Sequence, residues 1–494
     1  MKLHLLSCLA SAAILAATSP LEIRQAPNPS ASVDTGSLTG TTTTFASSTA
    51  TVNQFLGIPF GSKPPRFSPP AAAPKWSGIY DASKYKPACV QQFSYPQETR
   101  DFIIAVFNTP PPPAGEDEDC LNLNVFAPAA TVGAALKPVM FWIYGGAFSF
   151  GAGSLPLYDG SHFAADQDIV IVTINYRTNI FGFPGYPNQP ANQQNLGLLD
   201  QRLALDWTRR NIKAFGGDPD KITIFGESAG AGSVDTLVTD PPKPVPFRAA
   251  IMESGQASII AQNTDSRDSW NKLAANLSKT PEDAVATVEA MPATQLKALV
   301  EELELTFFPV KGDGATWSAT PRRDRQNSTA ANPIIARVPI LIGSNANEGT
   351  IYAAPENATA YGDFNFQCPA KYVGEESIAA GIPTWRYYFN ATFPNNTPFV
   401  GAGAFHSSEV PEVFGTYKEN AQTTTRQRDL SKAMMKAWAD FAKDPTQGPG
   451  WAQAPRIGVF GGDGQPVFQE VDAEAVDQGR CAQYKVIYDT YIPI

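Results

Sequence analysis

The chain has 494 residues, of which 43% are hydrophobic and 17% are charged, an ordinary balance for a globular protein with a large core. Its formal net charge of -10 argues against nucleic acid or an anionic membrane as a partner, because phosphate groups select basic surfaces. Beyond the N-terminus, no segment supplies the roughly 20 consecutive apolar residues of a membrane helix, so we expect no stable membrane anchor.

The N-terminal stretch MKLHLLSCLASAAILAATSP predicts a secretory signal peptide. It has a short basic start, an apolar run too brief to span a bilayer, and small residues before a Pro/Ser/Thr-rich continuation. A buried N-terminal helix is the alternative. We place the signal in residues 1–18 and expect residues 19–494 to form one secreted, extracellular domain, so Cys8 and His4 take no part in the chemistry.

The remaining cysteines and the Asn-X-Ser/Thr sequons fit an exported protein. The cysteines are Cys89, Cys120, Cys368 and Cys481. An even number in an oxidising compartment predicts two disulfides, with three pairings possible on the sequence alone. The sequons predict surface glycosylation at Asn276, Asn327, Asn357, Asn390 and Asn395.

The order of predicted elements indicates an α/β protein. The stretch TGTTTTFASSTATVNQFLGIPF is either a linker or an N-terminal hairpin, and its Thr, Val and Ile content favours strands. The runs KPVMFWIYGG, DIVIVTINYR, DKITIFGES and VPILIGSN are typical of strands buried on both faces. Between them, LGLLDQRLALDWTRRNIKAFGG predicts a helix that stops at Gly216. This alternation predicts a largely parallel sheet.

Ser228 is the candidate nucleophile. It stands in Gly226-Glu227-Ser228-Ala229-Gly230, directly after a predicted strand and before small residues that can open a helix. This pattern is typical of a nucleophile elbow, in which flanking glycines permit a strained strand-to-helix turn. A plain Gly/Ser turn is the alternative, but the neighbouring strand and helix favour the elbow.

His406 is the candidate base. A serine hydroxyl needs a neighbouring base, and in this kind of site the chain order is Ser, then Asp or Glu, then His. His406 is the only histidine downstream of Ser228, because His162 precedes it in a loop that contains Gly, Ser and Phe. A structural histidine is the alternative interpretation.

An acid must orient that base. The predicted strand in VPILIGSNANEGT is followed by a loop that carries Glu348. Spacing alone does not choose Glu348 over Glu356 or Glu375.

These residues resemble the type-B carboxylesterase/lipase family, the α/β-hydrolases that include cholinesterases and fungal lipases. Matching stretches include FLGIPFGSKPPRF, EDEDCLNLNVF, VMFWIYGGAFSFG, NLGLLDQRLALDW, NIKAFGGDPDKITIFGESAGAGS, GSNANEG and AFHSSEVPEVFG. In character the chain is most similar to fungal secreted carboxylesterases. The resemblance implies an α/β-hydrolase fold, a central, mostly parallel, twisted sheet flanked by helices, and hydrolysis of small-molecule or lipid esters without a metal or organic cofactor.

The resemblance also implies roles for individual residues. The nucleophile, orienting acid and general base are Ser228, Glu348 and His406. The backbone N–H groups of the oxyanion hole belong to Gly146, Ala147 and Ala229, although the family usually has a glycine where this chain has Ala147. Ser254 and Glu227 are placed beside the triad as supporting residues, with a buried structural role as the alternative for Ser254. The implied disulfides are Cys89–Cys120 and Cys368–Cys481, and the implied structural ion pair is Arg66–Glu118.

The loop between Cys89 and Cys120 bears on the substrate. Cholinesterases hold a quaternary ammonium on a tryptophan in this loop by cation–π attraction, and this chain has no tryptophan there. A choline ester is therefore not expected as the preferred substrate. An apolar run in the loop is either a lid that opens at a lipid surface or a loop packed by its own residues. The run comprises Phe102, Ile103, Ile104, Val106 and Phe107.

The segment from Glu348 to Cys368 is much shorter than the family usually has. Helices that normally wall the acyl pocket are therefore expected to be missing, which leaves either a more open pocket or a chain that has lost a piece. We expect a secreted carboxylic ester hydrolase that works through an acyl-enzyme. A lipase or sterol esterase acting at lipid interfaces is the alternative, and a non-catalytic cholinesterase-like binding protein is a remote one.

Overall fold

The computed structural model describes residues 28–45, 48, 50–129, 133–257, 266–461, 464 and 466–491. The expected signal peptide of residues 1–18, with Cys8 and His4, lies outside these residues. Within the described ranges, no helix is long and apolar enough to cross a bilayer.

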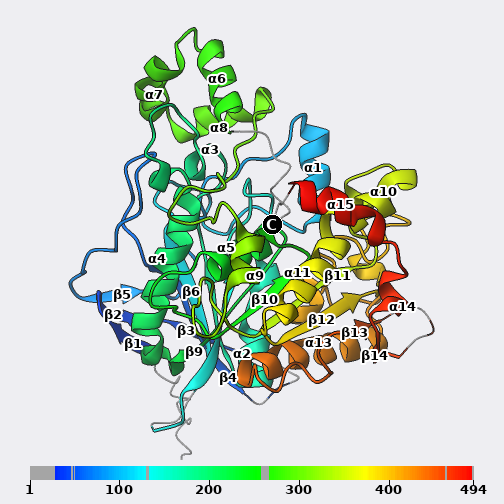
Figure 1. Cartoon of the computed structure of the whole chain (residues 1–494). Helices are drawn as coiled ribbons and strands as arrows, with labels where there is room; N and C mark the ends of the chain where they lie inside the picture. The colour runs from blue at the N-terminus through cyan, green and yellow to red at the C-terminus, as the bar shows by residue number, and fades with distance from the viewer. Residues whose placement is uncertain are drawn as a thin grey trace, which may run out of the picture.

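A mixed 11-stranded sheet runs through the molecule in the order β14-β13-β12-β11-β10-β9-β7-β8-β6-β4-β3 (Figure 1). All neighbouring strands from β13 to β8 in this order are parallel. The strands at the two ends of the sheet, β14 on one side and β6, β4 and β3 on the other, pair antiparallel. The predicted α/β class with a mostly parallel central sheet is therefore confirmed. The strands of this sheet are β3 (Thr41–Thr44), β4 (Thr51–Pro59), β6 (Asn122–Pro128), β7 (Lys137–Ile143), β8 (Val170–Ile174), β9 (Gly217–Glu227), β10 (Ala249–Glu253), β11 (Ile340–Asn345), β12 (Thr384–Phe389), β13 (Arg456–Phe460) and β14 (Phe468–Asp472).

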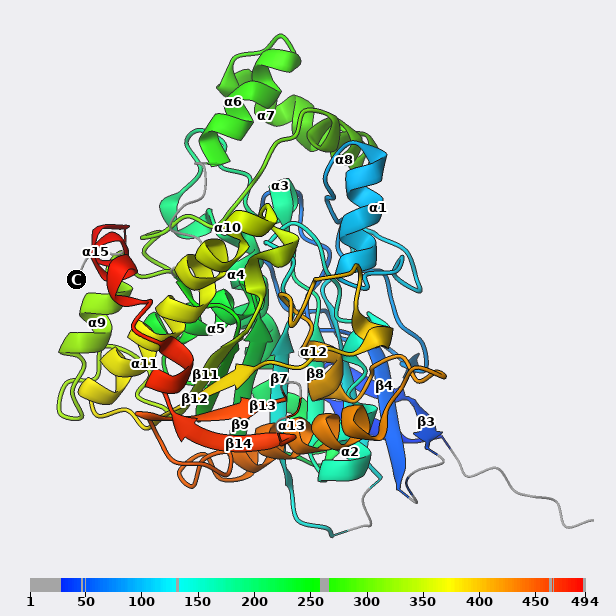
Figure 2. The same cartoon turned by 90° about the vertical axis from the view of Figure 1, so that its right-hand side faces the viewer.

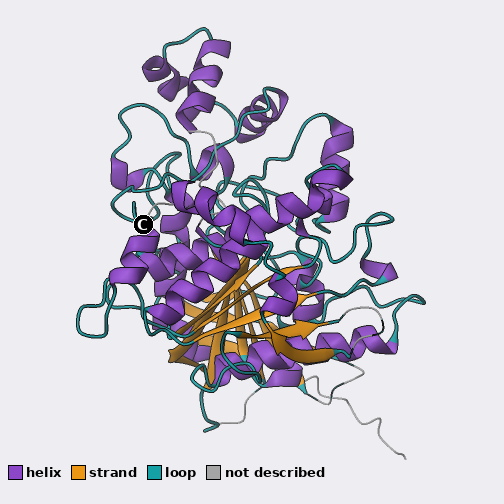
Figure 3. Cartoon of the chain, turned by 45° about the vertical axis from the view of Figure 1, so that its right-hand side comes forward, coloured by secondary structure: helices purple, strands orange, loops and turns teal. Residues whose placement is uncertain are grey.

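Helices cover both faces of the sheet (Figure 3). On one face α2 and α13 contact the strands, and on the other α4, α5 and α11 do. The helices are α1 (Gln97–Val106), α2 (Ser161–Gln167), α3 (Asn179–Gly182), α4 (Leu196–Asn211), α5 (Ala229–Thr239), α6 (Ser266–Asn276), α7 (Pro281–Ala290), α8 (Ala293–Glu302), α9 (Pro321–Asn327), α10 (Pro355–Gly362), α11 (Cys368–Ala379), α12 (Val410–Phe414), α13 (Thr425–Lys443), α14 (Glu474–Asp477) and α15 (Ala482–Tyr491). A small second sheet has the order β1 (Ser30–Val33), β2 (Gly36–Thr39) and β5 (Ile79–Asp81).

The predicted strands and helix form where the patterns place them. The Thr-rich N-terminal stretch is a hairpin rather than a linker, because β3 and β4 pair antiparallel from Thr41↔Gln54 to Thr44↔Thr51. The predicted helix is α4, continued by a 3-10 turn and ended by Gly216, whose φ of 83° is the left-handed conformation that glycine adopts at little cost. The runs predicted as buried strands are β7, β8, β9 and β11.

The parallel strands bring distant loops to one edge of the sheet. The strands β7, β9, β10 and β11 are consecutive neighbours, so the segments after their carboxyl ends meet at that edge. Ligands of open α/β sheets bind at such an edge. A lobe of α6, α7 and α8 lies beyond it, away from the strands, and α8 faces α1 (Figures 1 and 2).

Both disulfides implied by the resemblance are present, Cys89–Cys120 and Cys368–Cys481. The implied ion pair is also present, and Arg66 donates to both carboxylate oxygens of Glu118 at 2.8 and 2.6 Å. Glycosylation stays a prediction. The sequon asparagines Asn276, Asn327, Asn357 and Asn390 are exposed, whereas Asn395 is half-buried and its amide already donates to Lys418 and Thr423.

The longer disulfide loop should contribute more to stability. Replacing Cys368 and Cys481 together with alanine should lower the free energy of unfolding by about 2 to 5 kcal/mol, because the bond restricts an unfolded loop of 113 residues. In the matched variant at Cys89 and Cys120, which are 31 residues apart, the free energy of unfolding should fall by about 1 kcal/mol less, because a shorter loop restricts the unfolded chain less. Thermal and denaturant unfolding under non-reducing conditions measures both, and a larger loss for the shorter loop would contradict this entropic account.

Candidate active site

Ser228 lies at the sharp turn between β9 and α5, as the elbow pattern predicts. Its backbone has φ 56° and ψ -122°, outside the regions that L-residues prefer. Its N–H donates to the carbonyl oxygen of Glu253 at 2.9 Å, which ties the turn to the neighbouring strand β10. The side chain is half-buried and opens on a cavity.

The glycines on either side of Ser228 are needed because the backbone packs closely there, with no room for a side chain. A Cβ atom on Gly226 would lie 2.6 Å from the carbonyl oxygen of Ile143, and one on Gly230 would lie 2.0 Å from the same atom. Ile143 ends β7, so the elbow packs directly against the neighbouring strand. Only residues without a side chain allow this approach.

Glu348 and His406 are in direct contact. His406 Nδ1 lies 2.6 Å from Glu348 Oε2, and both side chains are buried. The other oxygen of Glu348 accepts the N–H of Asn345 at 2.6 Å. Glu356 and Glu375, which spacing left open as alternatives, are both exposed. Glu348 is thus the acid that the fold brings to the histidine.

His406 also faces a second carboxylate. Its Nε2 lies 3.1 Å from Glu227 Oε1, and among the described residues no hydrogen bond joins this nitrogen to the Ser228 hydroxyl. A neutral ring that donates from Nδ1 has only a lone pair at Nε2, so only the imidazolium cation satisfies both carboxylates. Burial by itself would lower the pKa of His406, but Glu227, Glu348 and the hydrogen bond to Glu348 outweigh it and raise that pKa to about 9.

Glu227 is buried beneath the candidate triad. Ser407 Oγ donates to its Oε1 at 2.6 Å. Burial raises the pKa of Glu227, while His406 and the Ser407 hydrogen bond act in the opposite direction. Ser407 follows His406 in the sequence, and only this contact indicates that it belongs to the site.

Ser254 reaches the candidate triad only through other residues. It is buried at the end of β10, and its hydroxyl lies 3.3 Å from Glu409 Oε1. The side-chain amide of Asn345 donates to Glu409 and to the carbonyl oxygen of Phe405, the latter at 2.9 Å. Burial, followed by the nearby carboxylates, raises the pKa of Glu409.

Sequence reasoning missed Asn345 and Glu409, although both carry a positional signal. Asn345 stands three residues before Glu348, and Glu409 stands three residues after His406. In a turn, two side chains three residues apart can point to the same site. The chemistry demands no amide such as Asn345, and Glu409 follows His406, outside the expected order of Ser, acid and His, so the pattern did not single them out.

The loop after β7 presents backbone donors. Gly146, Ala147 and Phe148 have φ values of 101°, 54° and 56°. A left-handed conformation costs a non-glycine residue roughly 1–2 kcal/mol. Among the described residues, the N–H groups of Gly146, Ala147 and Ala229 meet no acceptor. Backbone amides without an acceptor beside the candidate nucleophile are what an oxyanion hole requires.

A cavity of about 520 Å³ opens above these groups. Ser228, Gly146 and Ala147 line it, and most of the other lining residues are apolar or aromatic. They come from the first disulfide loop with its helix α1, from the loop after β7, from the segment after α8 and from the turn after Glu348. These residues include Phe93, Ile103, Phe107, Phe150, Leu305 and Phe308. The size and lining suit an uncharged organic substrate.

The apolar run in the disulfide loop forms the helix α1, so the expectation of a loop packed by its own residues is wrong. Val106 is buried against Ala402 and Phe405, outside the disulfide loop. Phe102 is 43% exposed. A helix forms because its apolar residues recur at helical spacing, with one face toward the cavity and another toward solvent.

The short segment after Glu348 still closes one side of the site. It folds as a 3-10 turn (Glu348–Ile351), α10 and a π-helical turn (Asp363–Gln367), which leads into α11 at Cys368. The rings of Phe366 and Tyr352 have centroids 4.5 and 5.4 Å from that of His406. Aromatic side chains therefore cover the imidazole, although the missing helices were expected to leave the pocket more open.

His162 lies away from this site. The sequence predicted a loop at this position, but His162 lies on the helix α2. Its ring stacks on that of Phe45, with the ring centroids 4.0 Å apart.

Comparison with known proteins identifies the family. The model of the carboxylesterase family matches residues 27–360 and 354–456. The chain belongs to the carboxylesterase family. The two matched segments overlap at residues 354–360, within the short Glu348 to Cys368 region.

Individual carboxylesterases are similar over most of the chain. It is 34% identical over 444 residues to para-nitrobenzyl esterase of Bacillus subtilis strain 168, which covers 79% of this chain and 86% of that protein. It is 32% identical over 462 residues to secreted lipase 5 of Gibberella zeae, covering 82% and 84%. It is 31% identical over 476 residues to cocaine esterase of Homo sapiens, covering 84% of each. The protein is therefore a carboxylesterase with the α/β-hydrolase fold.

The elbow makes a sharp packing prediction. Gly230→Ala should lower the free energy of unfolding by about 1 to 3 kcal/mol or more and abolish esterase activity, because its Cβ would overlap a backbone oxygen. Gly374→Ala in α11 is the matched control, since its nearest atom would lie at 3.4 Å and alanine favours a helix. Thermal unfolding and hydrolysis of a nitrophenyl ester measure the two variants. Equal behaviour of both would contradict the prediction.

Proposed function

We propose that the protein is a secreted carboxylic ester hydrolase that uses a Ser228-His406-Glu348 triad and an acyl-enzyme intermediate. One observation carries the proposal: the buried His406 is held at Nδ1 by the buried carboxylate of Glu348, and its Nε2 lies 3.1 Å from Glu227, the elbow residue that precedes Ser228. One catalytic domain, residues 19–494, would contain the whole site. Export is supported by the two disulfides and by the similarity to a secreted fungal lipase.

The chemistry proceeds in two halves. Ser228 Oγ attacks the ester carbonyl carbon while its proton passes to His406 Nε2. The oxyanion that forms accepts hydrogen bonds from the N–H groups of Gly146, Ala147 and Ala229. His406 then protonates the departing alcohol. Water, deprotonated by the same nitrogen, attacks the acyl-enzyme and releases the acid. In free enzymes the serine–histidine contact is often long and tightens when substrate binds.

Glu227 gives this site a particular electrostatic balance. Its carboxylate, 3.1 Å from Nε2, stabilises the imidazolium that forms when the serine proton is transferred. The same charge keeps the resting histidine protonated to a higher pH, which removes the base. Glu227 therefore stabilises the transition state but raises the pH at which the free enzyme becomes active.

Activity at a lipid surface is the second candidate. It is favoured by α1, where Ile103 and Phe107 line the cavity while Phe102 is exposed and lies near Phe399, with ring centroids 6.2 Å apart. Val400 next to it is fully exposed. Exposed apolar side chains on and beside a helix that lines the cavity fit a lipase that meets its substrate at an interface. A choline ester stays an unexpected substrate.

Hydrolysis of nitrophenyl esters of increasing acyl length, from two to about sixteen carbons, tests the proposal. Wild type should hydrolyse them, whereas Ser228→Ala and His406→Ala should lose at least about 10⁴-fold in kcat because the nucleophile or its base is gone. A burst of nitrophenol equal to the enzyme concentration would mark the acyl-enzyme. Full activity in His406→Ala would show that the triad is misassigned. A rate jump above the solubility limit of the long esters would identify the lipase.

The raised pKa of His406 predicts the pH profile. A general base must be neutral, so kcat/KM should rise with pH through about 9. Glu227→Gln removes the charge that raises this pKa most, so the rise should move about 1 to 2 units toward acid. The plateau should fall, because the imidazolium loses a partner. Glu412→Gln, a buried carboxylate paired with Gln427, is the control. An unmoved rise in Glu227→Gln would contradict this electrostatic account.

A further inference from the structure

The candidate oxyanion loop needs external support, because its backbone is in an unfavourable conformation. Its carbonyl groups are held by the N–H of Asn179, which donates to Phe148 O at 2.6 Å, and the N–H of Gln92, which donates to Ser149 O at 2.9 Å. Its returning limb begins at Gly151, which has a φ of 113°. The N–H of Gly151 is bound by a side chain rather than by the backbone.

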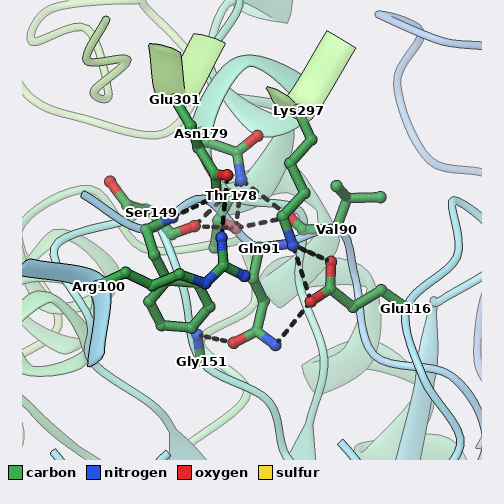
Figure 4. Close-up of polar contacts among 11 residues, drawn as sticks. Val90, Gln91, Arg100, Glu116, Ser149, Gly151, Thr178, Asn179, Lys297 and Glu301 are labelled. Atoms are coloured by element: carbon green, nitrogen blue, oxygen red, sulfur yellow. Dashed lines mark hydrogen bonds and ion pairs between the residues drawn. The ribbon is translucent and has the colours of Figure 1, made fainter. Parts of the chain in front are cut away.

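That side chain is Gln91, which is buried at 2% exposure. Its Oε1 accepts the N–H of Gly151 at 2.8 Å. Its Nε2 lies 3.4 Å from Glu116 Oε1, and its own backbone N–H donates to Glu116 Oε2 at 3.1 Å (Figure 4). One amide therefore bridges the oxyanion loop and a carboxylate.

Glu116 decides which way the amide faces. An ionised carboxylate only accepts hydrogen bonds, so the NH₂ end of Gln91 must face Glu116 and the oxygen must face Gly151. Lys297, on α8, donates to both oxygens of Glu116 at 3.0 and 2.8 Å and balances its charge. The orientation of the amide thus depends on an ion pair that reaches across to the lobe (Figure 4).

The first disulfide brings these groups together. Gln91 stands two residues after Cys89, and Glu116 stands four residues before Cys120. The two limbs of the loop run side by side, because Ala88 donates to Gly115 O and accepts from the N–H of Asp117, both at 2.9 Å. The loop therefore fixes Gln91 and Glu116 relative to each other before either meets the oxyanion loop.

We propose that Gln91 is a positioning residue for the oxyanion hole, oriented by the Glu116–Lys297 ion pair. It sets the limb that follows Gly146 and Ala147, and so the direction in which their N–H groups point. This inference rests on the proposed function, since it concerns how the transition state is stabilised. Gln91 does not touch the substrate, because the cavity is lined by its neighbour Gln92 instead.

The first test is Gln91→Met, which keeps the volume and removes both hydrogen bonds. Displacing catalytic groups by about 1 Å can cost on the order of 100-fold, so kcat for a nitrophenyl ester should fall about 10- to 100-fold with little change in KM. Affinity for a trifluoromethyl ketone, which forms a tetrahedral adduct at the serine, should fall by a similar factor. Gln189→Met, at another buried glutamine bound to a loop carbonyl, is the matched control and should leave both unchanged.

An exchange of groups tests the orientation. Gln91→Glu alone places two carboxylates beside each other and should lower kcat further than Gln91→Met does. Combining Gln91→Glu with Glu116→Gln restores a donor facing an acceptor, with an oxygen still toward Gly151. The double variant should recover most of the wild-type kcat and ketone affinity.

The outcomes separate this inference from the proposed function. Loss of activity in Ser228→Ala together with unchanged kcat and ketone affinity in Gln91→Met would overturn the role of Gln91 alone. A Gln91→Met variant that only unfolds at a lower temperature would do the same, as would a double variant no more active than Gln91→Glu. Retained activity in Ser228→Ala would overturn the proposed function itself.

Discussion

The candidate site depends on one buried arrangement of charge, an imidazole held between two carboxylates. His406 has Glu348 at one ring nitrogen and Glu227 at the other, in a region without solvent. Charges interact more strongly there than in water. Ser407 and Asn345 bind the two carboxylates, and these contacts hold the acids in place. The raised pKa of the histidine follows from this arrangement.

The sheet explains why these groups meet. Strands β7, β9, β10 and β11 are neighbours, and each delivers one part of the site from its carboxyl end. These parts are the amide loop, Ser228, Ser254 and Glu348. His406 arrives from a long segment after β12, where position is set by packing on Glu348, Phe366 and Tyr352. A rigid sheet is a common scaffold for positioning catalytic groups that lie on loops.

The substrate cavity belongs to parts of the molecule outside the sheet. The first disulfide loop, α8 and the segment after α8 contribute to its walls, and the ion pairs Arg100–Glu301 and Lys297–Glu116 join the loop to α8 at 3.0 and 2.8 Å. The same loop carries Gln91, which bonds the oxyanion limb. In the proposed mechanism, substrate selection and transition-state stabilisation would therefore share a support.

The sequence by itself determined the α/β fold, the elbow at Ser228, His406 as the one downstream histidine, and, through the family resemblance, both disulfides. These follow from local sequence patterns or from the small number of histidines and cysteines in the chain. Residue spacing left Glu348, Glu356 and Glu375 open, the family resemblance favoured Glu348, and the tertiary structure shows the contact of Glu348 with His406. Only the tertiary structure put Glu227 against the imidazole and showed that α1 is a helix. It also showed Ser254 bound to Glu409. The physical reason is that a side chain's partners depend on which strands are neighbours and which way each loop turns, and neither is encoded in residue spacing alone.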